Sequence, residues 1–435
     1  MRAMRWLLVP VLAALLSGCL GADRRTAPDE LAGWLRADPA VASAEVRHRE
    51  WMMDTRSSPR DGVGTAQLRS GADLPEFASR LQAYLTEHRS DWQRVALVVT
   101  EQSGHGVELG LDSAVNQRRI DALTRWRTDR RVESLVLETE KSSVRLRRGA
   151  DLLPLAGQLL QDPVVREARR GSERPGILAL EGPEQVASFL VDAEPERLSP
   201  LLAALRPFRP ARIEIEAVLA ERPRVKVLLG SADLPGAARA ASANSTPAEV
   251  TLEHDGLTVV GADATTLAGV DLARRARQLP GVRGVRLTRD GLYLTLAPER
   301  FAEAGQRIAT DPDAGRIARV ELAHDRNLVN LPPAQLERPA AVVQLLLADA
   351  SRPELRWTER EVTLILSDPD LAGWRRMARV LREHPGQGEQ TYSVVNRADG
   401  GSVRFTSTSS GRANPTTPPG GPGQAILDMW DCTAG

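Results

Sequence analysis

Two hydrophobic patterns alternate along the chain. Stretches with apolar residues at helical spacing are each followed by two short runs in which apolar and polar residues alternate. The alternation is clearest in EVTLEHDGLTVVG (249–261) and VRLTRDGLYLTL (285–296). A two-residue Asp-Gly turn between alternating runs is a strong hairpin signal. Both segments therefore predict β-hairpins, with turns at Asp255-Gly256 and Asp290-Gly291.

Nearly the same sequence motif recurs at the junctions between a strand and the next helix. SGADLPEFA (70–78), RGADLLPLA (148–156) and GSADLPGAA (230–238) each place an aspartate just before a helical stretch. A carboxylate at that position accepts hydrogen bonds from free N–H groups of the first turn and suits the helix dipole. Helix caps are therefore expected at Asp73, Asp151, Asp233 and Asp263. A cluster of catalytic carboxylates is the alternative, but these residues recur once per module.

The whole chain reads as about ten αββ units, a period typical of internal repeats. Helices are expected to start near 29, 74, 113, 151, 184, 233, 263, 298, 335 and 369. A lone hairpin is marginally stable in water, so we expect units to pair. The predicted fold class is α+β: tandem αββ repeats pair into two-layer sandwiches, in which antiparallel or mixed four-stranded sheets carry helices on one face. The predicted pairs are 29–111, 112–181, 182–261, 262–332 and 333–406.

The N-terminus has the pattern of an export signal. Arg2 and Arg5 precede an apolar run of 11 residues, Trp6–Leu16, which is short of the ~20 that a membrane-spanning helix needs. Leu16-Ser17-Gly18-Cys19 resembles the lipobox of bacterial lipoproteins. The resemblance implies a signal peptide at 1–18, acylation of Cys19, and a tether at 19–28 that holds the chain to the outer face of the cell membrane. An ordinary secretory signal is the alternative.

The modules themselves resemble a known family. A helix, a strand of the type dp-x-V-x-x-V-x-V, and a Gly turn into a second strand are similar to BON domains of bacterial envelope proteins. The resemblance covers 263–297 best, then 29–71 and 151–181, without the glycine that usually closes the second strand. It implies binding to lipid, cell wall or protein, and no catalysis. It transfers no individual site residue.

The C-terminus changes composition twice. Residues 407–423 are almost all Ser, Thr, Pro and Gly and predict a disordered linker. Residues 424–435 form a short apolar tail with Ile426, Leu427, Met429 and Trp430. This tail is expected to dock either on the body of the protein or on an envelope protein partner, and a frayed end is the third alternative. If Cys19 carries lipid, Cys432 is a free thiol or an intermolecular bridge, and a functionally silent cysteine is favoured.

Net charge and amino-acid composition restrict the classes of binding partner that we expect. The chain of 435 residues has 57 basic and 57 acidic residues, which disfavours nucleic acid as a partner. Lys141 and Lys226 are the only lysines among many arginines. This usage, with abundant Ala, Pro and Gly, indicates a high-GC bacterial source, such as an actinobacterium. The arginines between Arg118 and Arg148 are interleaved with acids, so a solvated helix face is favoured over a surface for anionic headgroups.

No catalytic, cofactor or metal motif is found in the sequence. The six histidines are dispersed, and neither HExxH, GxSxG, SxxK nor a phosphate-binding glycine loop occurs. Ser103-Gly104-His105-Gly106 is expected to be a hairpin turn, and Asp311-Pro312-Asp313 a turn and no calcium loop. We therefore expect a non-enzymatic, lipid-anchored binding or scaffold protein. The alternative is a small-ligand or lipid-binding lipoprotein with a pocket between a sheet and its helices.

Overall fold

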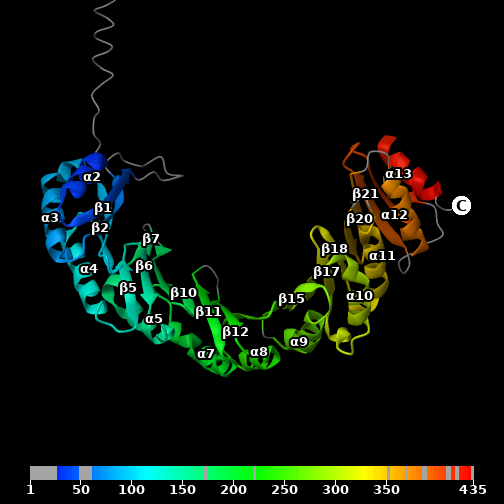
Figure 1. The fold of residues 1–435 in the computed structure, drawn as a ribbon, viewed down its shortest axis with the longest axis horizontal. Coiled ribbons are helices and arrows are strands. Elements are labelled where there is room, and N and C mark those ends of the chain that lie inside the picture. The colour runs from blue at the N-terminus through cyan, green and yellow to red at the C-terminus, as the bar shows by residue number, and fades with distance from the viewer. Residues whose placement is uncertain are drawn as a thin grey trace, which may run out of the picture. The chain divides into compact units, whose positions relative to one another are not determined.

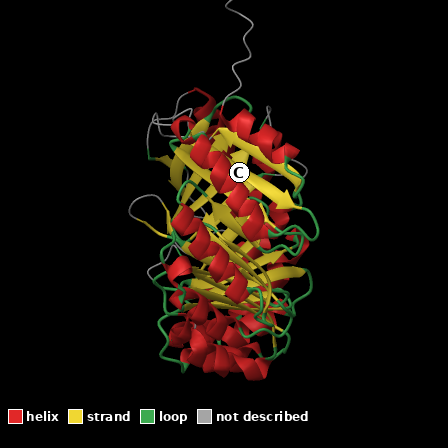
Figure 2. Ribbon diagram, turned by 90° about the vertical axis from the view of Figure 1, so that its left-hand side faces the viewer, coloured by secondary structure: helices red, strands yellow, loops and turns green. Residues whose placement is uncertain are grey.

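The computed structural model describes an α+β protein (Figure 2). The described residues are 27–48, 61–170, 174–218, 222–261, 263–349, 353–367, 371–384, 389–407, 413–416 and 421–432. The predicted signal peptide at 1–18, the lipidation site Cys19 and most of the tether lie outside them. Contacts divide the chain into two compact units, Met1–Glu196 and Arg197–Gly435.

The first unit consists of four helix-plus-hairpin modules (Figure 1). Its elements are α2 (Ala27–Ala37), β1 (Val41–His48), β2 (Asp61–Leu68), α3 (Leu74–Glu87), β3 (Arg94–Thr100), β4 (Gly106–Leu109), α4 (Ser113–Trp126), β5 (Val132–Leu137), β6 (Lys141–Leu146), α5 (Leu152–Gln161), α6 (Pro163–Arg166), β7 (Arg169–Arg170), β8 (Arg174–Pro175), β9 (Ile177–Glu181) and β10 (Gln185–Leu190).

The second unit repeats the same order and ends on an additional helix. Its elements are α7 (Ser199–Leu205), β11 (Pro210–Ala217), β12 (Arg224–Leu229), α8 (Leu234–Ser242), β13 (Glu249–His254), β14 (Leu257–Val260), α9 (Ala264–Arg277), β15 (Val282–Thr288), β16 (Gly291–Leu296), α10 (Phe301–Ala309), β17 (Val320–His324), β18 (Asn327–Leu331), α11 (Glu337–Leu347), β19 (Glu354–Thr358), β20 (Glu361–Leu366), α12 (Ala372–Glu383), β21 (Gln390–Asn396), β22 (Ser402–Ser407), β23 (Asn414–Pro415) and α13 (Gly421–Cys432).

Each hairpin joins the next one through a parallel ladder. In the first unit β1–β2, β3–β4, β5–β6 and β9–β10 are antiparallel, whereas β2–β3, β4–β5 and β6–β9 are parallel. The second unit alternates in the same way from β11 to β22. A parallel pair needs a crossover connection, and the helix between consecutive hairpins supplies it.

Separate four-stranded sandwiches are therefore not confirmed. The parallel ladder of β14 with β15 joins 182–261 to 262–332, and that of β18 with β19 joins 262–332 to 333–406. The physical reason is that each hairpin ends in a row of free N–H and C=O groups, which the next hairpin satisfies. The division into five pairs stays a prediction.

One expected helix is wrong. The sequence predicts a helix start near 184, but Gln185–Leu190 is strand β10. Ala187 and Phe189 are both buried at 1% exposure and lie two residues apart, which is the period of a strand. The helix of this module follows later, as α7. The expected helix starts near 74, 113, 151, 233 and 263 agree with α3, α4, α5, α8 and α9.

The two Asp-Gly hairpins differ in their turns. His254 pairs with Leu257, which confirms Asp255-Gly256 as the turn, and both residues have positive φ, 45° and 74°. In the second hairpin Thr288 pairs with Gly291, so the turn lies one residue earlier than predicted, at Arg289-Asp290. Gly291 is needed in the strand because a Cβ there would lie 2.5 Å from the carbonyl oxygen of Arg319.

Three of the four predicted caps form the expected hydrogen bond. The carboxylates of Asp73, Asp233 and Asp263 accept from backbone N–H groups three residues later, at 3.0, 2.8 and 2.8 Å. Asp151 occupies the same position before α5, but its side chain makes no cap hydrogen bond. The recurring sequence motif thus predicts where each helix starts. Whether the cap hydrogen bond forms depends on the local geometry.

Asp73→Ala is expected to lower the free energy of unfolding by about 1 kcal/mol, because the first turn of α3 loses its acceptor. Asp151→Ala in the same unit is the matched control and should cost clearly less. Urea unfolding of the full chain measures both. Equal losses for the two variants would show that the cap hydrogen bond is not the source of the effect.

The core of each unit lies between its sheet and its helices. In Figure 1 the helices of the second unit, α8 to α12, follow one side of its strands. Strand β12 shows the consequence, since Val225, Val227 and Leu229 are buried while Arg224 and Lys226 are exposed. The opposite face of the sheet therefore carries the polar members of each alternation. Among the described residues, no helix is long and apolar enough to span a bilayer.

The C-terminal region contains regular elements where the sequence predicts a disordered linker. Strand β23, at 414–415, pairs with β22, and α13 begins at Gly421. The intervening stretches, 408–412 and 417–420, lie outside the described residues. The predicted linker at 407–423 and tail at 424–435 thus contain elements that belong to the last module.

Candidate functional site

The exposed sheet face of the second unit is lined with charged and hydroxyl side chains. On β11 to β13 these side chains form ion pairs across neighbouring strands. Lys226 Nζ lies 3.1 Å from Glu253 Oε2, and Arg224 lies 3.4 Å from Glu249. Arg212 and Glu214 pair within β11 at 2.8 Å. This part of the face is therefore largely neutralised by its own partners.

The pattern changes at β14 to β17. Register places Thr258, Arg286, Tyr293 and Glu321 in one row across four neighbouring strands. The carboxylate of Glu321 accepts a hydrogen bond from the amide of Asn330 at 3.2 Å. Among the described residues, Arg286 has neither a hydrogen-bond nor an ion-pair partner. A guanidinium beside a tyrosine and a threonine is thus available on an open sheet face.

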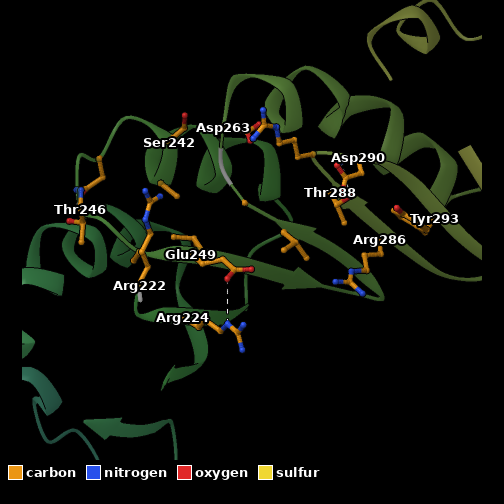
Figure 3. A pocket seen from close by; sticks show the side chains of 17 residues that line it. Arg222, Arg224, Ser242, Thr246, Glu249, Asp263, Arg286, Thr288, Asp290 and Tyr293 are labelled. Carbon is orange, nitrogen blue, oxygen red and sulfur yellow. Dashed lines mark hydrogen bonds and ion pairs between the residues drawn. The ribbon is translucent and has the colours of Figure 1, made fainter. Parts of the chain in front are cut away.

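A hollow of about 1100 Å³ lies at the strand ends beside this row (Figure 3). It is bounded by the starts of β12 and β13, the ends of β14 and β15, the loop after α8 and the start of α9. Its lining residues are Arg222, Arg224, Ala241, Ser242, Asn244, Thr246, Ala248, Glu249, Val250, Val260, Gly261, Asp263, Arg286, Thr288, Arg289, Asp290 and Tyr293.

The acids of the hollow are mostly engaged. Glu249 pairs with Arg224, and Asp263 accepts from the N–H of Thr266 as the cap of α9. Asp290 lies in the turn before Tyr293, and its backbone N–H donates to Thr288 Oγ1 at 3.1 Å. Arg222, Arg286 and Arg289 have no carboxylate partner among the described residues. The hollow therefore offers more free cations than free anions.

The arginine-dense segment of the first unit behaves differently. Arg118, Arg119, Arg125 and Arg127 of this segment each face an acid, at 3.4, 3.5, 3.0 and 3.6 Å. The acids are Glu167, Glu108, Asp162 and Glu101, which come from other elements. Arg131 pairs with an interleaved acid, Asp129, at 2.7 Å. Burial lowers the pKa of the Arg119 guanidinium, which its pairing with Glu108 opposes. These arginines stabilise the unit and leave little free charge.

The apolar tail docks on its own unit. Ile426, Leu427 and Trp430 are buried at 0–4% exposure, and Met429 is half-buried. Trp374 Nε1 donates to the carbonyl oxygen of Ile426 at 3.0 Å. Self-docking is one of the three alternatives left open by the sequence, and it is the arrangement seen. A partner would contact these buried side chains only if α13 separated from the rest of the second unit.

The other candidate positions have structural partners. Ser103, Gly104 and His105 lie in the turn between β3 and β4, as expected, and Gly106 begins β4. His105 Nδ1 accepts from the N–H of Leu135 at 3.2 Å. Asp311 and Asp313 both bind Arg275, at 2.6 Å. Within the described residues no group of three or more His, Cys, Asp or Glu side chains is placed to hold a metal ion. Cys432 is an exposed free thiol.

Sequence reasoning missed the hollow and its free arginines. Arg286 and Tyr293 lie in the segment that was identified as a hairpin, where they are polar or outward members of the alternation. Their outward position in the strand alternation is the sequence feature from which this surface could have been predicted. Arg222 comes from a segment some 60 residues earlier, and only the parallel stacking of hairpins brings the two segments to one hollow.

Comparison with known proteins gives no relative. No family model, no curated protein and no solved structure matches this chain.

Proposed function

We propose that this chain is a non-enzymatic, lipid-anchored envelope protein that presents a binding surface outside the cytoplasmic membrane. Its location rests on Leu16-Ser17-Gly18-Cys19, which follows a short apolar run behind two arginines. Its binding role rests on one observation, the exposed polar sheet face of the second unit. Repeat proteins commonly use such extended surfaces for binding. The resemblance of the modules to BON domains points the same way.

The alternative function requires a ligand pocket between a sheet and its helices. The packing between the sheet and the helices does not support it. In the second unit Leu252, Leu272 and Leu287 fill that space and are 0–1% exposed. Side chains packed in this way exclude a ligand of useful size. The open face is the better candidate.

Protease added to intact cells whose wall has been removed is expected to digest this chain, because both units would lie outside the membrane. A cytoplasmic protein of the same cells should survive as the control. Immunoblotting against each unit reads the result. Protection equal to that of the cytoplasmic control until the membrane is broken would overturn the proposed location.

A further inference from the structure

Free guanidinium groups gather around the hollow. Some arginines of this unit are paired, Arg319 with Glu359 and both Arg326 and Arg397 with Glu354, at 2.8–3.0 Å. Arg356 on the same sheet face has no partner among the described residues but stands outside the hollow. Arg222, Arg286 and Arg289 lack such partners among the described residues. A guanidinium presents five N–H donors and is always charged, which suits phosphate and carboxylate groups. These three arginines therefore leave anion-binding capacity unused.

The three arginines come from separate places in the fold. Arg222 precedes β12, Arg286 lies within β15 and Arg289 is in the following turn. Figure 3 shows Arg222 and Arg286 toward opposite sides of the hollow. A single small anion contacts the arginine on only one side of the hollow, whereas a chain with repeated anionic groups contacts the arginines on both sides. Thr246, Ser242 and the hydroxyl of Tyr293 add neutral hydrogen-bonding groups along the way.

We propose that the hollow binds a polyanionic chain with repeated phosphate or carboxylate groups. This inference rests on the proposed binding function and names its ligand class. Anionic headgroups of a bilayer offer the same chemistry, but the arginines surround a hollow at the strand ends, which a flexible soluble chain enters more readily than a flat surface. Asp290 is the one acid of the hollow without a cation or a cap role, so it weakens the binding of an anion.

Inorganic polyphosphate is the probe, and titration of the full chain in detergent is the measurement. We expect binding that weakens as salt rises, because the arginines are exposed to solvent. Arg286→Gln and Arg222→Gln should each weaken binding about fivefold, which corresponds to ~1 kcal/mol. Asp290→Asn should strengthen it. Arg356→Gln is the matched control, since Arg356 is exposed on the same sheet face outside the hollow, and it should leave binding unchanged.

Several results would overturn the proposal. These are no binding of polyphosphate, an equal loss in Arg286→Gln and Arg356→Gln, or equally tight binding of single inorganic phosphate ions. Vesicles of phosphatidylglycerol test the lipid source: vesicle binding that depends on Arg286, with none of polyphosphate, would reject the soluble chain. Unchanged thermal unfolding in each variant shows that the fold is intact. Failure here leaves the protease result on intact cells unaffected, so the two proposals fail separately.

Discussion

Trp430→Ala is expected to lower the free energy of unfolding of the second unit by about 3–5 kcal/mol, the usual cost of truncating a buried aromatic side chain. Trp430 is 1% exposed in α13. Its ring centroid lies 4.7 Å from that of Tyr392, 5.1 Å from Phe405 and 6.1 Å from Trp374. These three aromatic neighbours are themselves buried at 0–3% exposure, so we expect the variant to leave a cavity.

Polar contacts at Trp430 also hold α13 against the rest of the second unit. Arg382 donates to the carbonyl oxygen of Trp430 at 2.9 Å, and its guanidinium lies 5.4 Å from the tryptophan ring centroid. Burial raises the pKa of Tyr392 to about 12. The helix thus closes the apolar end of the last module, as terminal caps do in repeat proteins.

Chemical denaturation followed by tryptophan fluorescence measures the loss. Met429→Ala is the matched control, because Met429 lies one position away in α13 and is only half-buried; we expect a smaller loss there. A stability equal to that of the parent protein in Trp430→Ala would mean that α13 does not stabilise the unit. In that case the tail would be free to bind a partner, which is another alternative allowed by the sequence.

Cys19→Ser is expected to move the protein from the membrane fraction to the soluble fraction. The proposed anchor depends on acylation of the Cys19 thiol, which a serine at this position does not support. Two or more buried acyl chains contribute ~0.8 kcal/mol per methylene group, enough for stable attachment. Loss of these chains leaves the two folded units with no other proposed hold on the bilayer.

Fractionation of cells that express each form tests the anchor. Cys432→Ser is the control, since Cys432 is the other cysteine of the chain and lies exposed in α13; it should leave the protein in the membrane fraction. A Cys19→Ser protein that stays fully membrane-bound would contradict the lipid anchor. A mass for the mature parent protein without added lipid would contradict it as well.

Local structure could be predicted from the sequence where one physical signal dominates. Alternation with a central Asp-Gly pair gave the hairpin at 249–261, and the recurring aspartates gave the helix starts at α3, α5 and α8. The signal failed near 184, where Gln185–Leu190 has buried residues at the strand period but was assigned to a helix. A short apolar run cannot by itself distinguish the two periods.

The arrangement of hairpins could not be predicted, because it depends on which free strand edge meets which. The sequence favoured closed pairs, whereas β14 and β15 form a parallel ladder across a predicted border. The hollow follows from that stacking. Arg222 and Arg286 are both unremarkable in the sequence, and their lack of partners is visible only once the neighbouring side chains are in place.

Site-specific photo-cross-linking in intact cells tests the central claim, that the exposed sheet face of the second unit is a binding surface. A photoreactive amino acid replaces Tyr293 on that face and, in a separate variant, Leu345, which is 53% exposed on helix α11. We predict adducts of raised mass from position 293 and none from position 345. Adducts from position 345 with none from position 293 would contradict the account and assign binding to the helices.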